Sequence, residues 1–120
     1  MKKIWSIISV ILVVLAVVFK VIIYSKEKQE LANLRQSAEE GNADAQSNLA
    51  DLYFSGKSVS VNKAEATKWY LKAAEQGDAR AQLNLGYLYS SGEGIPKDEA
   101  EGEKWYRKSA ENGNADAQYS

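Results

Sequence analysis

The sequence contains no cysteine and no histidine among its 120 residues. Without cysteine there are no disulfides, no thiol nucleophile and no lipidation at a thiol, and without either residue the usual ligands of transition metals are missing. A catalytic site would have to use carboxylates, lysine, tyrosine or serine. Because no nucleophile and base converge in the sequence, we expect no enzymatic activity, no cofactor and no metal.

The chain also has little net charge, with 15 basic and 16 acidic residues. Lys2, Lys3 and Lys20 belong to the N-terminal segment, which leaves 12 basic and 16 acidic residues, or −4, in the remainder. A remainder of this charge lacks the basic surface that binds phosphate backbones, so we expect no nucleic acid partner.

One long apolar run is present, over residues 4–24, and only Ser6, Ser9 and Lys20 interrupt it. As a helix these residues would extend about 31 Å, which matches a bilayer core of about 30 Å. Lys20 lies one turn from the end, where its ammonium can reach the headgroups. The sequence therefore predicts a transmembrane helix over 4–24 after a short basic tail, 1–3.

No small-x-small cleavage site follows this run, which favours an uncleaved signal anchor over a cleaved signal peptide. Basic residues flank both ends of the apolar run, so the number of basic residues on each side barely indicates which end of the helix faces the cytoplasm. The signal-like layout favours a single-pass protein of the bacterial inner membrane, with its C-terminal part outside the cytoplasm. The alternative places that part in the cytoplasm.

The rest of the chain repeats itself. Residues 38–73 and 74–109 align without a gap at 18 of 36 positions, and residues 110–120 match 38–48 at 8 of 11. Each unit holds two apolar patterns with helical spacing, which in the first unit are Ala45, Leu49, Leu52 and Tyr53, then Ala66, Trp69, Tyr70 and Ala73. Such a unit predicts an antiparallel helix pair that buries its aromatic residues only by stacking on a neighbour.

Glycine and short polar residues separate the predicted helices. Glycines such as Gly56 and Gly92 are placed to end them, and Asn or Asp residues follow as candidate N-caps: Asn42, Asn62, Asp78, Asp98 and Asn114. The first unit has Ser58 where the second has Gly94, and it lacks a counterpart of Pro96, so we expect its loop to be looser.

The units approximate the pattern A-E-x-G-x-A-x-A-Q-x-x-L-G-x-x-Y-x-x-G, followed by K-A-x-x-W-Y-x-K-A-A. This pattern resembles the Sel1-like repeat, a relative of the tetratricopeptide repeat. Residues 74–109 carry it most fully, and the first unit departs from it at Ala50 and Ser58. The resemblance implies an all-α fold, a short α-solenoid of antiparallel helix pairs over residues 41–120. Two 36-residue units would be complete and a third truncated.

Residues 25–40 occupy the place of a preceding second helix, and we interpret them as a polar capping helix for the solenoid. No glycine or proline occurs before Gly41, so this cap and the membrane helix could be nearly continuous.

Several positions on the first helix of each pair differ between the units. Packing demands the same residue in every unit, whereas recognition of an irregular partner does not. In repeats of this kind the first helices line the concave surface. We therefore expect contacts with a protein partner at Asn48, Asp51, Phe54, Arg80, Asn84 and Tyr87. Ser47 also differs from its counterpart, and ordinary variation of a solvated surface is the alternative at each position.

Acidic residues gather at Asp98, Glu99, Glu101 and Glu103. On a helix such residues are typical of a solvated face with favourable charges near the N-terminus, rather than of an acid and base pair.

Families with Sel1-like repeats generally act as adaptors and assembly platforms. The resemblance thus implies a membrane-anchored scaffold that holds a helix or short peptide segment of another protein. Three alternatives remain: an envelope-facing inhibitor, such as an immunity protein that blocks a toxin or a lipid-degrading effector; an enzyme of the envelope, which lacks a nucleophile and metal ligands; and a shortened member of a longer family.

Overall fold

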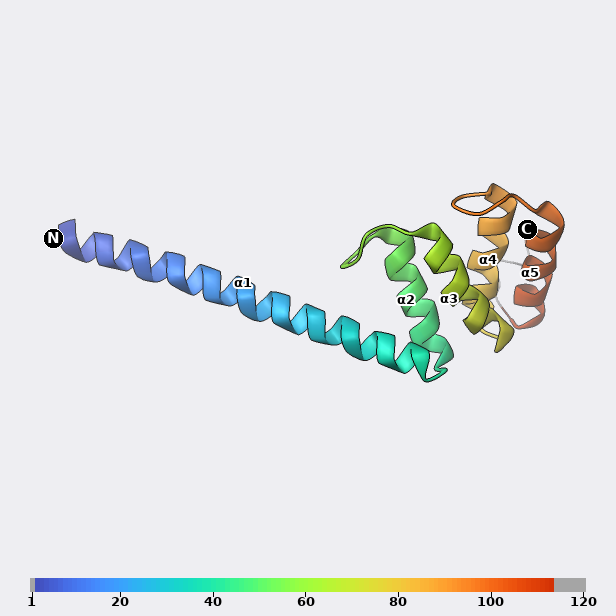
Figure 1. Ribbon diagram of the computed structural model, residues 1–120, viewed down its shortest axis with the longest axis horizontal. Coiled ribbons are helices and arrows are strands. Elements are labelled where there is room, and N and C mark those ends of the chain that lie inside the picture. Colours follow the sequence, from blue (N-terminus) through green and yellow to red (C-terminus); the bar gives the residue numbers. More distant parts are fainter. Residues whose placement is uncertain (1, 114–120) are drawn as a thin grey trace. The chain divides into compact units, whose positions relative to one another are not determined.

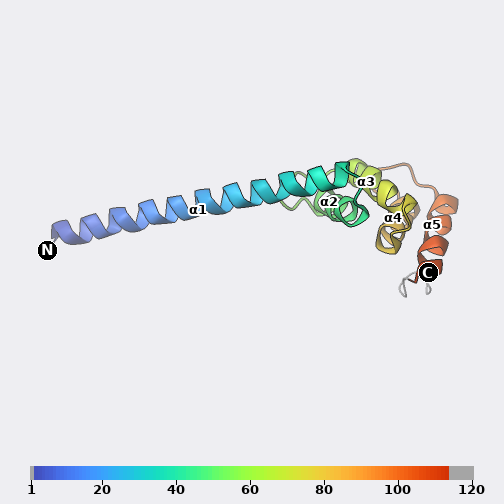
Figure 2. The ribbon, with the colours of Figure 1, turned by 90° about the horizontal axis from the view of Figure 1, so that it is seen from below.

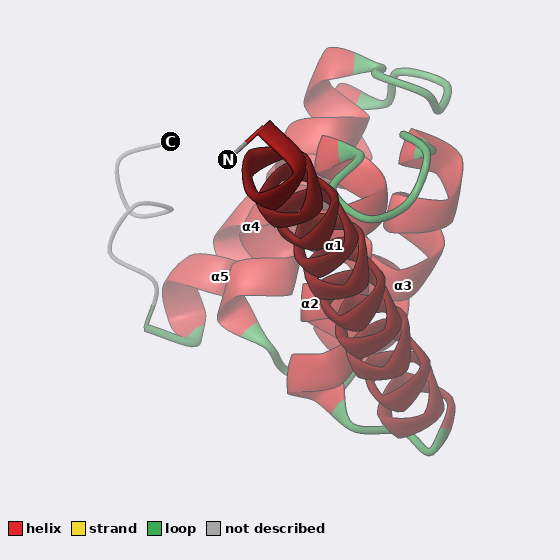
Figure 3. Cartoon of the chain, turned by 90° about the vertical axis from the view of Figure 1, so that its left-hand side faces the viewer, coloured by secondary structure: helices red, strands yellow, loops and turns green. Residues whose placement is uncertain are grey.

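The structure is a computed structural model that describes residues 2–113, and in this range all regular elements are helices (Figures 1 and 3). They are α1 (Lys2–Glu39), α2 (Ala43–Ser55), α3 (Lys63–Glu75), α4 (Ala79–Ser91) and α5 (Glu99–Glu111). The chain divides into two units, Met1–Ala32 and Asn33–Ser120. The all-helical fold expected from the sequence is confirmed.

The first unit consists of the N-terminal part of α1. All residues from 2 to 30 are exposed, including the apolar residues of the segment 4–24. The helix is long and apolar enough to cross a membrane, which is compatible with a membrane anchor or a signal sequence. No glycine or proline interrupts it, and α1 continues as one helix through the segment expected to form a cap.

The second unit is a stack of helices. α2 packs on α3, α3 on α4 and α4 on α5, so the four helices follow one another in chain order (Figures 1 and 2). Leu49, Leu85 and Leu88 are fully buried, and Trp69 and Trp105 are nearly so. The apolar side chains are thus buried within the stack, and the contact of α3 with α4 joins one helix pair to the next.

Four short polar side chains begin the helices of the second unit, as the sequence predicts. Asn42, Asn62, Asp78 and Asp98 each accept a hydrogen bond from the backbone N–H three residues later, at 2.9 to 3.0 Å. Each bond satisfies an amide that has no partner within its helix. The further candidate, Asn114, lies outside the described residues.

The two loops within the helix pairs share one backbone path. Ser58 adopts φ 65°, in the left-handed region, as does its counterpart Gly94 with φ 72°. The N–H of Asn62 donates to the carbonyl of Tyr53 at 2.8 Å, and the second loop closes with the equivalent bond at the same distance. The structure thus does not show the looser first loop expected from its sequence. Instead, Ser58 holds a conformation that glycine adopts more easily.

A buried glutamine links the helices of adjacent pairs. The side-chain amide of Gln82, 3% exposed, donates to the carbonyl of Ala74 at 3.0 Å and accepts from the amide of Asn112 at 2.9 Å. Gln46 makes the same two kinds of bond one repeat earlier. Gln82 therefore connects the ends of α3, α4 and α5, a role that the repeated glutamine in the sequence did not reveal.

Candidate protein-binding surface

The six residues expected to contact a partner lie on two helices of the second unit. Three belong to α2 and three to α4: Asn48, Asp51 and Phe54, then Arg80, Asn84 and Tyr87. Within each helix they are spaced three or four residues apart, which places them on one face. The structure brings them together as a polar cluster and an aromatic cluster, and we call the resulting region the α2–α4 surface.

The polar cluster is centred on Arg80. Its guanidinium donates to one carboxylate oxygen of Asp51 through Nη1 and to Oδ1 of Asn48, at 2.9 Å, through Nη2. The other oxygen of Asp51 accepts a hydrogen bond from the hydroxyl of Tyr70 on α3. Burial, and then this bond to Asp51, raises the pKa of Tyr70 well above its usual value, so the hydroxyl stays protonated as a donor.

This cluster joins three helices, because Asp51 lies on α2, Tyr70 on α3 and Arg80 on α4. The side chains of Arg80 and Asp51 are 46% and 39% exposed. An ion pair in such contact with water contributes about 1 kcal/mol or less to stability. Together with the bond to Asn48, it holds the guanidinium of Arg80 against α2.

The aromatic cluster pairs Phe54 with Tyr87. Their ring centroids are 6.4 Å apart and the planes meet at 70°, an edge-to-face arrangement. The hydroxyl of Tyr87 donates to Oε1 of Glu93 at 3.2 Å, and Oε2 of Glu93 lies 2.9 Å from Nζ of Lys63. This ammonium also lies 5.2 Å from the Phe54 ring centroid, within the range of a cation–π contact.

Two side chains of the aromatic cluster, Glu93 and Tyr87, have shifted pKa values. The hydrogen bond from Lys63 holds the pKa of Glu93 below its usual value. The bond to Glu93 in turn raises the pKa of Tyr87. At neutral pH Glu93 is therefore ionised, and Tyr87 is a neutral donor.

The two clusters meet at a small hollow. Phe54, Tyr70, Asn84 and Tyr87 line it, and its volume is about 30 Å³. This space admits the tip of one side chain, and most of its wall is aromatic. Asn84 brings a side-chain amide, which is both a donor and an acceptor, to the same wall.

Three residues of this surface were not among those expected from the sequence. Tyr70 was predicted to pack in the core; its ring is buried, but its hydroxyl reaches Asp51. Lys63 and Glu93 are 30 residues apart and meet only because α3 and the α4–α5 loop pack together. Both differ from their counterparts in the other repeat, but they lie outside the first helices, so only a comparison extended to α3 and to the loop after α4 would have included them.

One further position singled out by the sequence comparison is not on the surface. Ser47 is fully buried, so its difference from the equivalent Leu83 belongs to packing rather than to recognition.

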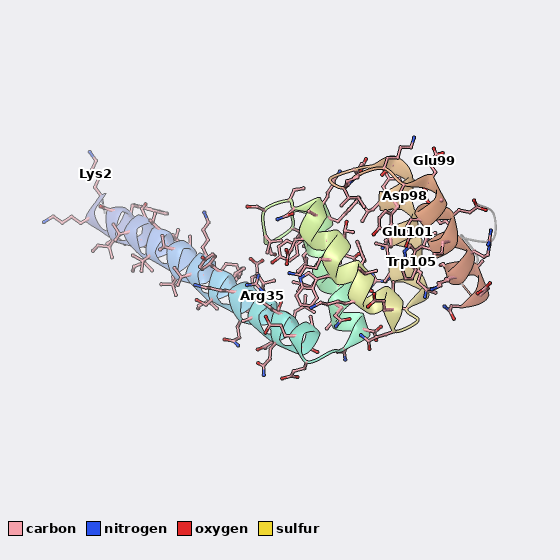
Figure 4. The ribbon with its side chains drawn as sticks, turned by 45° about the vertical axis from the view of Figure 1, so that its right-hand side comes forward. Lys2, Arg35, Asp98, Glu99, Glu101 and Trp105 are labelled. Carbon is pink, nitrogen blue, oxygen red and sulfur yellow. The ribbon has the colours of Figure 1, made fainter. Side chains whose placement is uncertain are left out.

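The acidic residues at the start of α5, of which Figure 4 labels Asp98, Glu99 and Glu101, form a cap and ion pairs. Asp98 accepts from the N–H of Glu101 as the N-cap. Glu99 pairs with Lys97 at 3.1 Å, and Glu103 pairs with Arg107 at 3.0 Å. Among residues 2–113, no group of acidic side chains is arranged to hold a metal ion.

Residues 43–78 and 79–114 each match the Sel1 repeat. The chain belongs to the Sel1 repeat family. The two matches begin at the starts of α2 and α4, so each repeat contributes one helix pair, α2 with α3 or α4 with α5. The 36-residue period and the resemblance derived from the sequence are confirmed.

Solved Sel1 repeat structures share this fold. A Sel1 repeat protein from Oxalobacter formigenes is 38% identical, with a TM-score of 0.69, over 76% of this chain and 68% of its own. Cysteine rich protein B from Helicobacter pylori is 30% identical, with a TM-score of 0.73, over 77% of this chain and 70% of its own.

A third structure is a protective antigen of uropathogenic Escherichia coli strains that displays an SLR fold. It is 38% identical, with a TM-score of 0.72, over 74% of this chain. The present chain spans only 19% of that protein's length. No curated protein sequence matches the chain.

Membership of this family indicates a helical-repeat scaffold for protein–protein interaction, of a kind that is generally not enzymatic. The Helicobacter pylori protein is described as rich in cysteine, whereas this chain has none. The repeats of the present chain are held by packing and by buried hydrogen bonds such as those of Gln82.

Proposed function

We propose that this Sel1 repeat protein is a membrane-anchored adaptor that binds a helix or short peptide segment of another protein through the α2–α4 surface. One observation carries the proposal. Six residues were named from their positions on the first helix of each repeat. Three of them, Phe54, Asn84 and Tyr87, line one aromatic hollow, and the other three form the polar cluster that bonds to Tyr70, the fourth lining residue.

The chemistry of this surface suits a protein partner. Tyr87 is 45% exposed and lies beside Phe54, so a partner's apolar side chain could cover both rings. Exposed aromatic residues of this kind often supply most of the binding energy at protein interfaces. The ion pairs on either side, Arg80 with Asp51 and Lys63 with Glu93, would form a polar rim.

A photo-crosslinking amino acid placed at Tyr87 tests this surface in living cells. We expect a discrete protein adduct from this position and none from the same amino acid at Glu103, an exposed residue of α5. Phe54→Ala should reduce the adduct, because it removes half of the aromatic pair. Equal adducts from both positions, or none from either, would contradict the proposal.

Residues 4–24 serve in this proposal as a signal anchor in a bacterial inner membrane, with the repeats outside the cytoplasm. Alkaline extraction of membranes should leave the protein in the pellet. A C-terminal tag should then be digested by protease in intact spheroplasts. Digestion only after lysis would instead place the repeats in the cytoplasm, and release at alkaline pH would rule out the anchor.

A further inference from the structure

The apolar segment of α1 has one face that differs from the rest. Only four of its residues, from 4 to 24, are not bulky and apolar: Ser6, Ser9, Ala16 and Lys20. α1 is an uninterrupted helix over this segment. At 3.6 residues per turn, steps of three, seven and four residues return to the same side of a helix. All four therefore lie on one face, which we call the Lys20 face.

Lys20 is the only charged residue of this segment. Its side chain is exposed, and it makes no hydrogen bond or ion pair within residues 2–113. The segment contains no acidic residue that could pair with it. A charged side chain at membrane depth is costly unless it reaches the headgroups or meets an opposite charge.

Charge decides between the possible occupants of this face. A second copy packed in parallel would bring two Lys20 ammonium groups to the same depth, where they repel each other. Lipid alone would accommodate Lys20, but it gives no reason for Ser6, Ser9 and Ala16 to share its face. A transmembrane helix of another protein would explain why these small residues share the face. Small side chains let helix backbones approach closely, and serine hydroxyls form hydrogen bonds across the contact.

We propose that the Lys20 face binds a transmembrane helix of another protein, which carries an Asp or Glu at the depth of Lys20. That depth is four residues, or about 6 Å along the helix, from Tyr24 at the end of the segment. The carboxylate neutralises the ammonium, and the small residues toward the N-terminus form the rest of the contact. This inference rests on the proposed membrane anchor.

The test uses the full-length protein in its membrane, with a photo-crosslinking amino acid at Val13 or at Ile11. Val13 lies on the Lys20 face, whereas Ile11, at a similar depth, lies nearly opposite. We expect a protein adduct from Val13 and only lipid labelling from Ile11. Lys20→Leu should lower the Val13 adduct roughly threefold to thirtyfold, the range for one polar contact between membrane helices, and Lys20→Arg should retain it.

Capture of a protein is not sufficient support. The captured protein must carry an Asp or Glu within a membrane segment, and its substitution by Asn or Gln must lower the adduct as Lys20→Leu does. Exchanging the charges, with Lys20→Glu and the partner's acid changed to Lys, should restore the adduct.

Five results would overturn the inference: lipid labelling alone at both positions, equal protein adducts at both, an adduct with a second copy of this chain, an adduct with a protein that has no Asp or Glu in a membrane segment, or an adduct that does not depend on Lys20. Alkaline extraction of the same membranes separates its failure from that of the anchor. If the protein stays in the pellet but labels only lipid, the membrane anchor stands and the inferred helix contact is wrong. If the protein is released, both the membrane anchor and the inferred helix contact are wrong.

Discussion

Ser58 is the only residue other than glycine, within residues 2–113, that has a positive φ. A side chain in the left-handed region costs about 1 kcal/mol or more, and glycine avoids most of that cost. We therefore predict that Ser58→Gly stabilises the protein by about 0.5 to 1 kcal/mol. Urea denaturation followed by tryptophan fluorescence measures the change.

Ser60→Gly in the same loop is the matched control, because Ser60 has no positive φ. It should give no gain in stability. An equal gain from both substitutions would show that general loop flexibility, and not the conformation of Ser58, is responsible.

Trp105 and Tyr87 are large aromatic residues with opposite expected roles. Trp105 is 4% exposed on α5, which packs on α4, so Trp105→Ala should cost about 3 to 5 kcal/mol. Tyr87 is mostly on the surface, so Tyr87→Ala should cost about 1 kcal/mol or less. Circular dichroism during urea denaturation compares the two. If Tyr87→Ala unfolded the domain as readily as Trp105→Ala, the assignment of the α2–α4 surface would be wrong.

The contact between α4 and α5 depends on a glycine inside a helix. A Cβ at Gly102 would lie 2.2 Å from Oγ of Ser90 and 2.9 Å from the carbonyl oxygen of Gly86. Gly102→Ala should therefore destabilise the protein by about 1 to 2 kcal/mol, although alanine favours helix by about 1 kcal/mol over glycine. Thermal denaturation of this variant and of the exposed control Glu103→Ala tests this, since the control should change stability by less than about 0.5 kcal/mol.

Gln82 connects three helix ends, so its loss should affect α3, α4 and α5 together. Gln82→Ala removes two hydrogen bonds and leaves the buried carbonyl of Ala74 without this partner. We expect a cost of about 2 to 3 kcal/mol. Gln36→Ala removes one exposed bond, to Glu40, and should cost much less. Equal unfolding midpoints of the two variants in urea would contradict this role.

The helices and their ends could be predicted from the sequence because they depend on local chemistry. Asn62 and Asp98 were assigned as caps from their positions alone, and each cap bond spans only three residues. Contacts between residues far apart in the sequence were harder to predict. The pair of Lys63 with Glu93 joins residues 30 positions apart, and only the stacking of one repeat on the next brings them together.

Six residues of the candidate surface were named from the sequence, but the contacts that these residues make were not predicted. Comparing the repeats selected Asp51 and Arg80 separately, and the sequence gives no sign that these two side chains form an ion pair. Tyr70 was assigned to packing because it occurs in both repeats. Its hydroxyl nevertheless bonds to Asp51, a residue found only in the first repeat.

For the chain as a whole, the capping role expected of residues 25–40 can be measured. In the second unit, Ala38 is buried, its carbonyl accepts from Gln46, and Arg35 donates to the hydroxyl of Tyr53 at 3.1 Å. We predict that a fragment of residues 41–120 is less stable than one of residues 33–120 by about 2 kcal/mol or more. Urea denaturation of the two fragments measures this difference, and equal stabilities would rule out the capping role.

Binding of another protein through the α2–α4 surface is the central claim. Calorimetric titration of the purified protein with the partner identified at Tyr87 tests it most directly. Tyr87→Ala should weaken the affinity roughly tenfold or more, whereas Glu103→Ala should leave it unchanged. Wild-type affinity in Tyr87→Ala, together with weaker binding in Glu103→Ala, would contradict the claim and place the binding site on α5.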